Sequence, residues 1–131
     1  MSARGLEPAI LIHRGHSYHV DKTIPYIRSS TKLVFLGSCR GLGKLDAVVE
    51  NAPDAAVIAT KAVGSHRIND PLLKTLNDEL LRGSPSLDWP AFWAAQQARL
   101  GSTGLFADYI PPYRNRALAF LRGYFAHLNA R

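Results

Sequence analysis

The stretch Lys32-Leu-Val-Phe-Leu-Gly-Ser-Cys-Arg-Gly-Leu-Gly43 decides the predicted fold. An apolar run is broken by a glycine and a serine, and Cys39, the only cysteine of the chain, follows at once. Two further glycines then open an amphipathic segment. This order predicts a buried strand that places Cys39 at its carboxyl end, where α/β proteins carry their chemistry.

Strand and helix patterns alternate around this stretch. Short apolar runs predict strands at Pro8–His13, Lys32–Leu36 and Ala55–Thr60, the first of them buried on both faces. Helices are expected between them, over Lys22–Arg28 and over Gly43–Asn51. Strands joined by short helical crossovers predict an α/β fold with a parallel sheet.

The second half of the chain has helical patterns instead. We expect helices from Asp70 to Gly83, from Asp88 to Leu100 and from Arg114 to Leu128, with a loop pinned to the body between the last two. Residues 1–68 thus form the core of a single domain and 69–131 a helical extension. Apolar residues expected on the buried helix faces or in the pinned loop are Leu72, Leu73, Leu76, Leu80, Phe92, Ala95, Leu100, Leu105, Phe106, Tyr109, Ile110, Leu118, Leu121, Phe125 and Leu128.

Composition bounds the functional classes. With 131 residues, 47% of them hydrophobic, the chain can fold as one domain, and no apolar run reaches the length of a membrane span. One cysteine fits a reducing cytoplasm. The net charge of +6 could attract nucleic acid, but no nucleic-acid-binding motif accompanies it, so a solvated basic surface is favoured.

Three phosphate-binding motifs fail at Cys39. A P-loop needs Ser or Thr after its lysine, and Leu45 follows Lys44. A dinucleotide fingerprint needs a small residue where Asp46 stands. A thiol phosphatase needs arginine six positions after the cysteine, which is again Leu45. Only weak anion binding by Arg40 and Lys44 at a helix start remains.

A cysteine nucleophile with a histidine base fits better. The first strand ends in His13-Arg-Gly-His-Ser-Tyr-His19, and parallel neighbours bring this loop to the sheet edge of Cys39. The helix start and its flanking cations, Arg40 and Lys44, favour a thiolate there.

At this point the chain resembles the clan CD cysteine peptidases, the group of caspases, gingipains and CHAT domains. The resemblance rests on Ala9-Ile-Leu-Ile-His-Arg-Gly-His16 and on Leu33-Val-Phe-Leu-Gly-Ser-Cys-Arg-Gly41, and covers about a third of the chain. It implies a partial, three-layer caspase-like domain. A second copy or an N-terminal segment outside this chain would then complete the narrow sheet.

The resemblance also implies roles for individual residues. Cys39 matches the nucleophile and His16 the catalytic histidine, acting without cofactor or metal on a peptide or protein substrate. The oxyanion hole would use the backbone N–H of Cys39 and an amide of the histidine loop, at Gly15 or at Ser17, which replaces the family's glycine.

Several alternatives stay open. Cys39 could be an inert buried residue, and His13, His16 and His19 could hold a metal, although no carboxylate pair supports such a site. The chain could also be an inactive α/β interaction module or, third, a basic nucleic-acid-binding domain. Candidates for a substrate pocket are Arg40, Ser65, His66 and Arg67, the last three of which could equally belong to an ordinary loop.

Overall fold

The computed structural model describes residues 9–83 and 87–130, and its centre is a four-stranded sheet. The strands are β1 (Ile10–His13), β2 (Leu33–Leu36), β3 (Ala56–Thr60) and β4 (Tyr109–Ile110), in the order β1-β2-β3-β4. The first three are parallel, and β4 runs antiparallel to β3. The predicted α/β class and its three parallel strands are confirmed, whereas the fourth strand was expected to be part of a loop.

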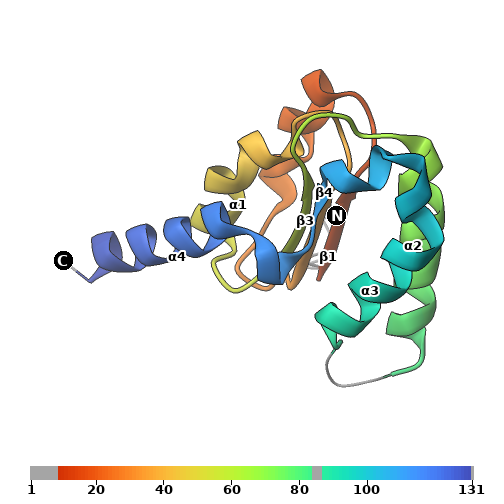
Figure 1. The fold of residues 1–131 in the computed structure, drawn as a ribbon. Helices are drawn as coiled ribbons and strands as arrows, with labels where there is room; N and C mark the ends of the chain where they lie inside the picture. Colours follow the sequence, from red (N-terminus) through yellow and green to blue (C-terminus); the bar gives the residue numbers. More distant parts are fainter. Residues whose placement is uncertain (1–8, 84–86, 131) are drawn as a thin grey trace.

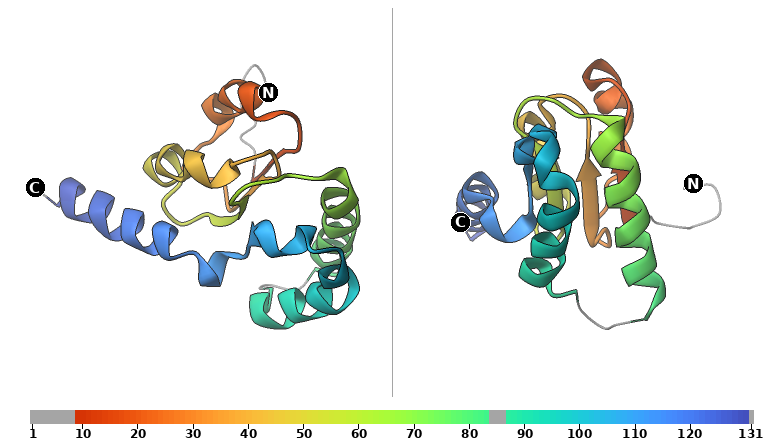
Figure 2. Two further views of the ribbon diagram at one scale, coloured as in Figure 1. Left: turned by 45° about the horizontal axis from the view of Figure 1, so that its top comes forward. Right: turned by 45° about the vertical axis from the view of Figure 1, so that its right-hand side comes forward.

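Helices cover both faces of the sheet. In Figures 1 and 2, α1 (Leu45–Asn51) and α4 (Arg116–Asn129) lie on one side, and α2 (His66–Leu81) and α3 (Trp89–Leu100) on the other. Short 3₁₀ helices fill the connections, at Ser17–Lys22, Ile24–Tyr26, Gly41–Lys44, Gly101–Thr103, Leu105–Asp108 and Pro112–Arg114. The sheet is therefore the middle layer of three.

Alternation along the central strands builds a core on each face. Successive side chains of a strand point to opposite sides. Val34, Leu36 and Val57 accordingly pack with α1 and Leu118 of α4. Their neighbours Leu33, Phe35 and Ile58 pack with α2 and α3. Burial on both faces explains why β2 reads as a continuous apolar run.

The prediction that the first strand is buried on both faces is wrong. Leu11 and His13 are buried, but Ile10 and Ile12 keep 43% and 46% of their surface exposed. β1 pairs only with β2 among the described residues, so it lies at the edge of the described sheet. Pro8, where the strand was expected to begin, lies outside the described residues.

The helix expected over Lys22–Arg28 is also wrong. The chain forms two 3₁₀ helices there, separated at Thr23. Pro25 lacks an N–H and disfavours the α conformation at Ile24, so a continuous α-helix cannot run through this segment.

Helix α2 begins earlier than predicted, at His66 instead of Asp70. Ser65 is its N-cap, and the Ser65 side chain accepts a hydrogen bond from the Arg67 N–H at 3.2 Å. Pro71 therefore lies inside the helix rather than at its start. The predicted end of α2 is right, because Gly83 follows the helix with a positive φ of 75°. The predicted start of α3 is also right, because the Asp88 side chain caps it.

Helix α4 extends away from the body, with the chain end at its far tip (Figure 1). Leu118 is buried and Arg122 bonds the carbonyls of Pro53 and Ala55, which anchors the first half. Leu128 is 40% exposed, so its predicted burial is wrong, as it is for Leu80 of α2 and Ala95 of α3. Among the described helices, none is long and apolar enough to cross a membrane.

Candidate functional site

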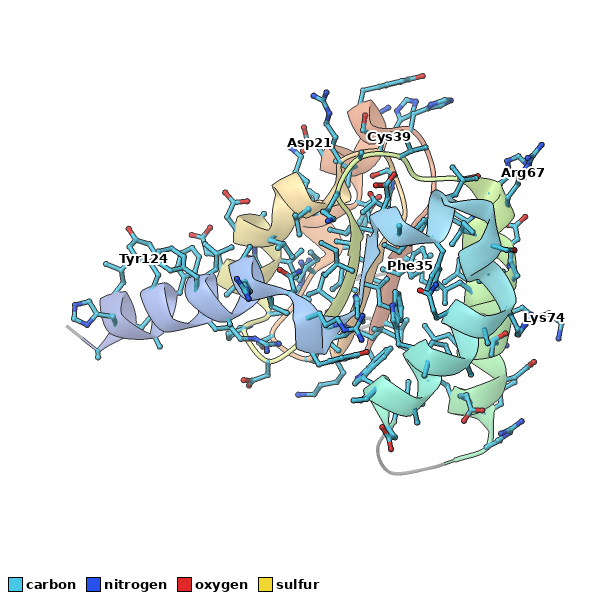
Figure 3. All side chains as sticks on the ribbon, viewed as in Figure 1. Asp21, Phe35, Cys39, Arg67, Lys74 and Tyr124 are labelled. Carbon is cyan, nitrogen blue, oxygen red and sulfur yellow. The ribbon has the colours of Figure 1, made fainter. Side chains whose placement is uncertain are left out.

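The loops that carry His16 and Cys39 leave the same edge of the sheet, as predicted. His13 ends β1 opposite Leu36, the last residue of β2. The next residue, Gly37, donates its N–H to the His13 carbonyl at 2.8 Å. Figure 3 shows Cys39 at this end of the molecule, together with Asp21 of the first loop.

Cys39 lies in a tight turn between β2 and the 3₁₀ helix that precedes α1. The thiol is exposed, so the alternative of a buried, inert cysteine is wrong. Arg40 follows with φ 56° and ψ 35°, a left-handed conformation that costs a non-glycine residue about 1 kcal/mol. The Arg40 N–H donates to the Ala62 carbonyl at 2.8 Å, which holds the strained residue in place.

The backbone of this turn is clamped from β3 by Thr60. The fully buried Thr60 hydroxyl donates to the Ser38 carbonyl and accepts from the Gly41 N–H, the latter at 3.0 Å. Within the described residues the Cys39 N–H makes no hydrogen bond. The amide that the resemblance assigns to an oxyanion hole is thus free to donate.

Close packing leaves room only for glycine beside the turn. A Cβ atom on Gly64 would lie 2.0 Å from the Gly37 carbonyl oxygen, and one on Gly41 would lie 2.4 Å from the Leu36 carbonyl oxygen. Both distances are far below van der Waals contact. The turn is therefore fixed by its neighbours as well as by its hydrogen bonds.

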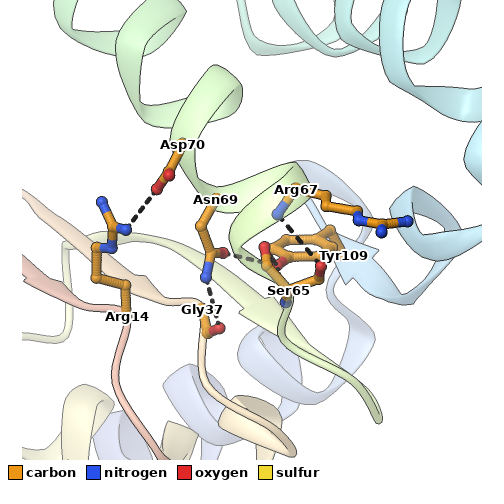
Figure 4. A network of polar contacts seen from close by, with 7 residues as sticks. All are labelled: Arg14, Gly37, Ser65, Arg67, Asn69, Asp70 and Tyr109. Atoms are coloured by element: carbon orange, nitrogen blue, oxygen red, sulfur yellow. Dashed lines mark hydrogen bonds and ion pairs between the residues drawn. The ribbon is translucent and has the colours of Figure 1, made fainter.

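A buried polar network lies behind the turn (Figure 4). Asn69 of α2 donates from Nδ2 to the Gly37 carbonyl at 3.0 Å. The Tyr109 hydroxyl lies 2.6 Å from the Asn69 Oδ1 and accepts from the Ser65 N–H at 2.9 Å. A chain of hydrogen bonds thus runs from Tyr109 of β4 through Asn69 of α2 to Gly37, which lies two positions before Cys39.

The Tyr109 hydroxyl keeps its proton more firmly than an exposed tyrosine. Burial raises its pKa above the ordinary value of 10.0, and the charges of Cys39 and Asp108 raise it further. The hydrogen bond with the Ser65 backbone opposes these effects. At neutral pH, Tyr109 is therefore a reliable hydrogen-bond donor.

The histidine loop is far more open. His16 and Tyr18 are exposed, with their rings stacked at 5.3 Å between centroids, and the His19 ring lies 4.2 Å from that of Tyr18. His13 is the buried member: Nδ1 contacts the Thr23 hydroxyl at 2.8 Å, and Nε2 contacts the His16 carbonyl at 3.2 Å. No hydrogen bond joins the His16 ring to the Cys39 thiol among the described residues.

Two exposed ion pairs connect the loops to their surroundings. Arg14 pairs with Asp70 of α2 at 2.6 Å, and Lys44 pairs with Asp21 at 2.7 Å across the two strand-end loops. All four side chains are more than a third exposed, so each pair contributes less than about 1 kcal/mol.

The four residues predicted to line a substrate pocket are spread over two elements. Arg40 belongs to the Cys39 turn, whereas Ser65 caps α2 and His66 and Arg67 form its exposed first turn. Cavities of about 390, 280 and 420 Å³ lie between α2 and α3, beside Tyr109, and at the start of α4. These cavities are lined by other residues, so the pocket assignment stays a prediction. Within residues 9–83 and 87–130, no three His, Cys, Asp or Glu side chains gather as a metal site would require.

Sequence reasoning missed Thr60, Asn69 and Tyr109. Thr60 is a polar residue at the end of an apolar strand, and that position was the one available signal. Asn69 precedes an Asp-Pro pair that was taken as a helix start, so it was placed in a loop. Tyr109 was counted only as an apolar anchor.

In comparisons with protein-family models, with curated proteins and with solved structures, nothing matched this chain.

Proposed function

We propose that this chain is a thiol-dependent hydrolase of the caspase-like type, with Cys39 as nucleophile and His16 as general base and acid. One observation carries the proposal: Cys39 is exposed in a clamped turn at the end of β2, and the His16 loop leaves the neighbouring end of β1. A nucleophile and a base must share one site, and this topology brings them to the same sheet edge.

The chemistry would proceed through an acyl-enzyme. The Cys39 sulfur forms a bond to the carbonyl carbon of a peptide while its proton passes to His16. The C–N bond then breaks as His16 returns that proton to the leaving amine. Water, deprotonated by His16, next attacks the thioester, the C–S bond breaks, and the thiol regains its proton. The free Cys39 N–H would donate to the oxyanion at each tetrahedral stage.

The His16 side chain must turn toward the thiol for this reaction. It is exposed, so rotation about its side-chain bonds meets little resistance from packing. Catalytic contacts in ligand-free proteins are often longer than in the working complex. Substrate binding at this edge would then select the paired arrangement.

The test is alkylation of Cys39 by iodoacetamide at pH 6.5. Since the imidazole accepts the thiol proton, His16→Ala should slow the reaction about tenfold. The matched control is His19→Ala, because His19 is an exposed histidine that contacts the same Tyr18 ring. Equal rates in the wild type and in both variants would overturn the dyad.

A non-catalytic interaction module is the second candidate. Its support is the unpartnered outer stripe of α4, where Phe120 and Tyr124 are 70% and 50% exposed and their rings stack. Exposed aromatic side chains of this kind are enriched at protein interfaces. The alkylation experiment separates the two candidates, since an interaction module gives His16 no influence on Cys39.

A further inference from the structure

The Gly37 carbonyl is one point at which α2 can act on the backbone that leads to Cys39. Gly37 is the first residue after β2. It still bonds β1, because its N–H donates to the His13 carbonyl. Its own carbonyl bonds Asn69 rather than another strand. Asn69 therefore helps to set the direction of the peptide that leads into Ser38 and Cys39, beside the clamp that Thr60 applies to Ser38 and Gly41.

The orientation of Asn69 is itself determined. An asparagine side chain can turn over and exchange its oxygen and nitrogen. Here the Tyr109 hydroxyl donates to the Oδ1, which leaves the Nδ2 to face the Gly37 carbonyl. The Ser65 N–H donates to the same hydroxyl, and the Ser65 carbonyl lies 3.2 Å from it as a second acceptor, but Asn69 Oδ1 at 2.6 Å is the nearer acceptor for the Tyr109 proton.

We infer that Asn69 is a positioning residue for the Cys39 nucleophile, and that Tyr109 fixes the amide of Asn69 in the working orientation. The inference rests on the proposed function. Among the described residues no hydrogen bond joins either side chain to the thiol, and the hydrogen-bonded route from both to Cys39 runs through the Gly37 carbonyl. Their contribution is to hold the turn where His16 can meet the sulfur, since small displacements of reacting groups cost large factors in rate.

If Asn69 had only a structural role, its replacement would lower stability without changing the effect of His16 on Cys39. Asn69 is 2% exposed, so its replacement lowers stability in any case. A positioning role adds a dependence between Asn69 and His16, which share no hydrogen bond among the described residues. That dependence is measured by a double-mutant cycle.

The cycle uses iodoacetamide alkylation of Cys39 at pH 6.5 in four proteins: wild type, His16→Ala, Asn69→Ala and the double variant. In the wild-type background His16→Ala should slow alkylation about tenfold. In the Asn69→Ala background the same substitution should slow it less than about twofold, because the thiol no longer faces the histidine. Tyr109→Phe keeps the ring and should give an intermediate dependence, and it serves if Asn69→Ala does not fold.

The matched control is Asn115→Ala. Asn115 is a buried asparagine that caps α4 by accepting from the Leu118 N–H, and among the described residues it makes no hydrogen bond to the Cys39 turn. In this background the tenfold effect of His16→Ala should persist. If the tenfold effect also persists in the Asn69→Ala and Tyr109→Phe backgrounds, the positioning role is overturned and the dyad stands. If His16→Ala has no effect even in the wild type, both the dyad and the positioning role are overturned.

Discussion

The turn after β2 and the loop after β1 leave the same sheet edge, but they are held in different ways. The Cys39 turn is fixed by buried side chains from β3 and α2 and by the close approach of Gly64. The His16 loop presents exposed rings, with buried His13 as its internal support. The proposed nucleophile is thus held in place, whereas the proposed base lies on a more exposed loop. In such a site, motion of the histidine loop, not of the cysteine turn, would set the rate.

The largest difference should appear between alanine at Gly64, which packs against the Cys39 turn, and alanine at Gly15, which lies in the His16 loop. Gly64→Ala places a Cβ 2.0 Å from the Gly37 carbonyl oxygen, so the backbone must shift, at a cost of about 3 kcal/mol. Gly15→Ala meets only the His13 ring at 3.6 Å, an ordinary contact, and should cost less than about 0.5 kcal/mol. Urea unfolding of the two variants measures both values. Similar losses would mean that the loops are equally constrained.

The next effect concerns two threonines: Thr60 of β3 bonds the Cys39 turn, and Thr23 contacts His13 beneath the His16 loop. Thr60→Val removes two buried hydrogen bonds, one to the Ser38 carbonyl and one from the Gly41 N–H, at a total cost of about 2 kcal/mol. Among the described residues, these two groups then keep only the 3.2 Å hydrogen bond that they make with each other. Thr23→Val removes a contact to His13 at a half-exposed position, at a cost of about 0.5 kcal/mol. Thermal and urea unfolding are the measurements. A larger loss for Thr23→Val would reverse the comparison.

The smallest effect is a pH dependence of stability that comes from Tyr109, in the polar network behind the Cys39 turn. The pKa of Tyr109 is raised in the folded protein, chiefly by burial, so the folded state holds this proton more tightly than the unfolded state. Its stabilising contribution is complete below pH 10 and is lost as the pH rises through the folded pKa. The free energy of unfolding should therefore fall above pH 10, by at most about 1.4 kcal/mol per pH unit.

Tyr109→Phe is the control for this pH dependence. The variant lacks the titrating hydroxyl, so its stability should fall less steeply above pH 10 than that of the wild type. Parallel curves for the two proteins would show that other groups cause the alkaline loss.

The sequence predicted those parts of the fold that depend on local patterns. Continuous apolar runs gave β2 and β3, and the Asp88 cap gave α3, because such signals lie within a few residues of the element. The start of α2 was misplaced because Pro71 suggested a first helical position, whereas the Ser65 cap outweighs it. β4 was missed because two residues carry no periodicity.

In the candidate site, too, local patterns predicted some residues and tertiary contacts determine the others. The places of Cys39 and His16 follow from strand order alone, and the topology agrees with that prediction. Asn69 and Tyr109 matter only through contacts across α2 and β4, and the register of β4 against β3 is a tertiary property. No local rule could have joined them to Cys39.

The position of Tyr109 far downstream of Cys39 has a consequence during protein synthesis. A ribosome-bound chain that ends before β4 already contains Cys39, but Asn69 then lacks the Tyr109 hydroxyl that contacts its Oδ1. The turn can reach its final form only after most of the chain has emerged. Emergence of β4 would thus precede completion of the proposed site, so a reactive dyad would not form on shorter nascent chains.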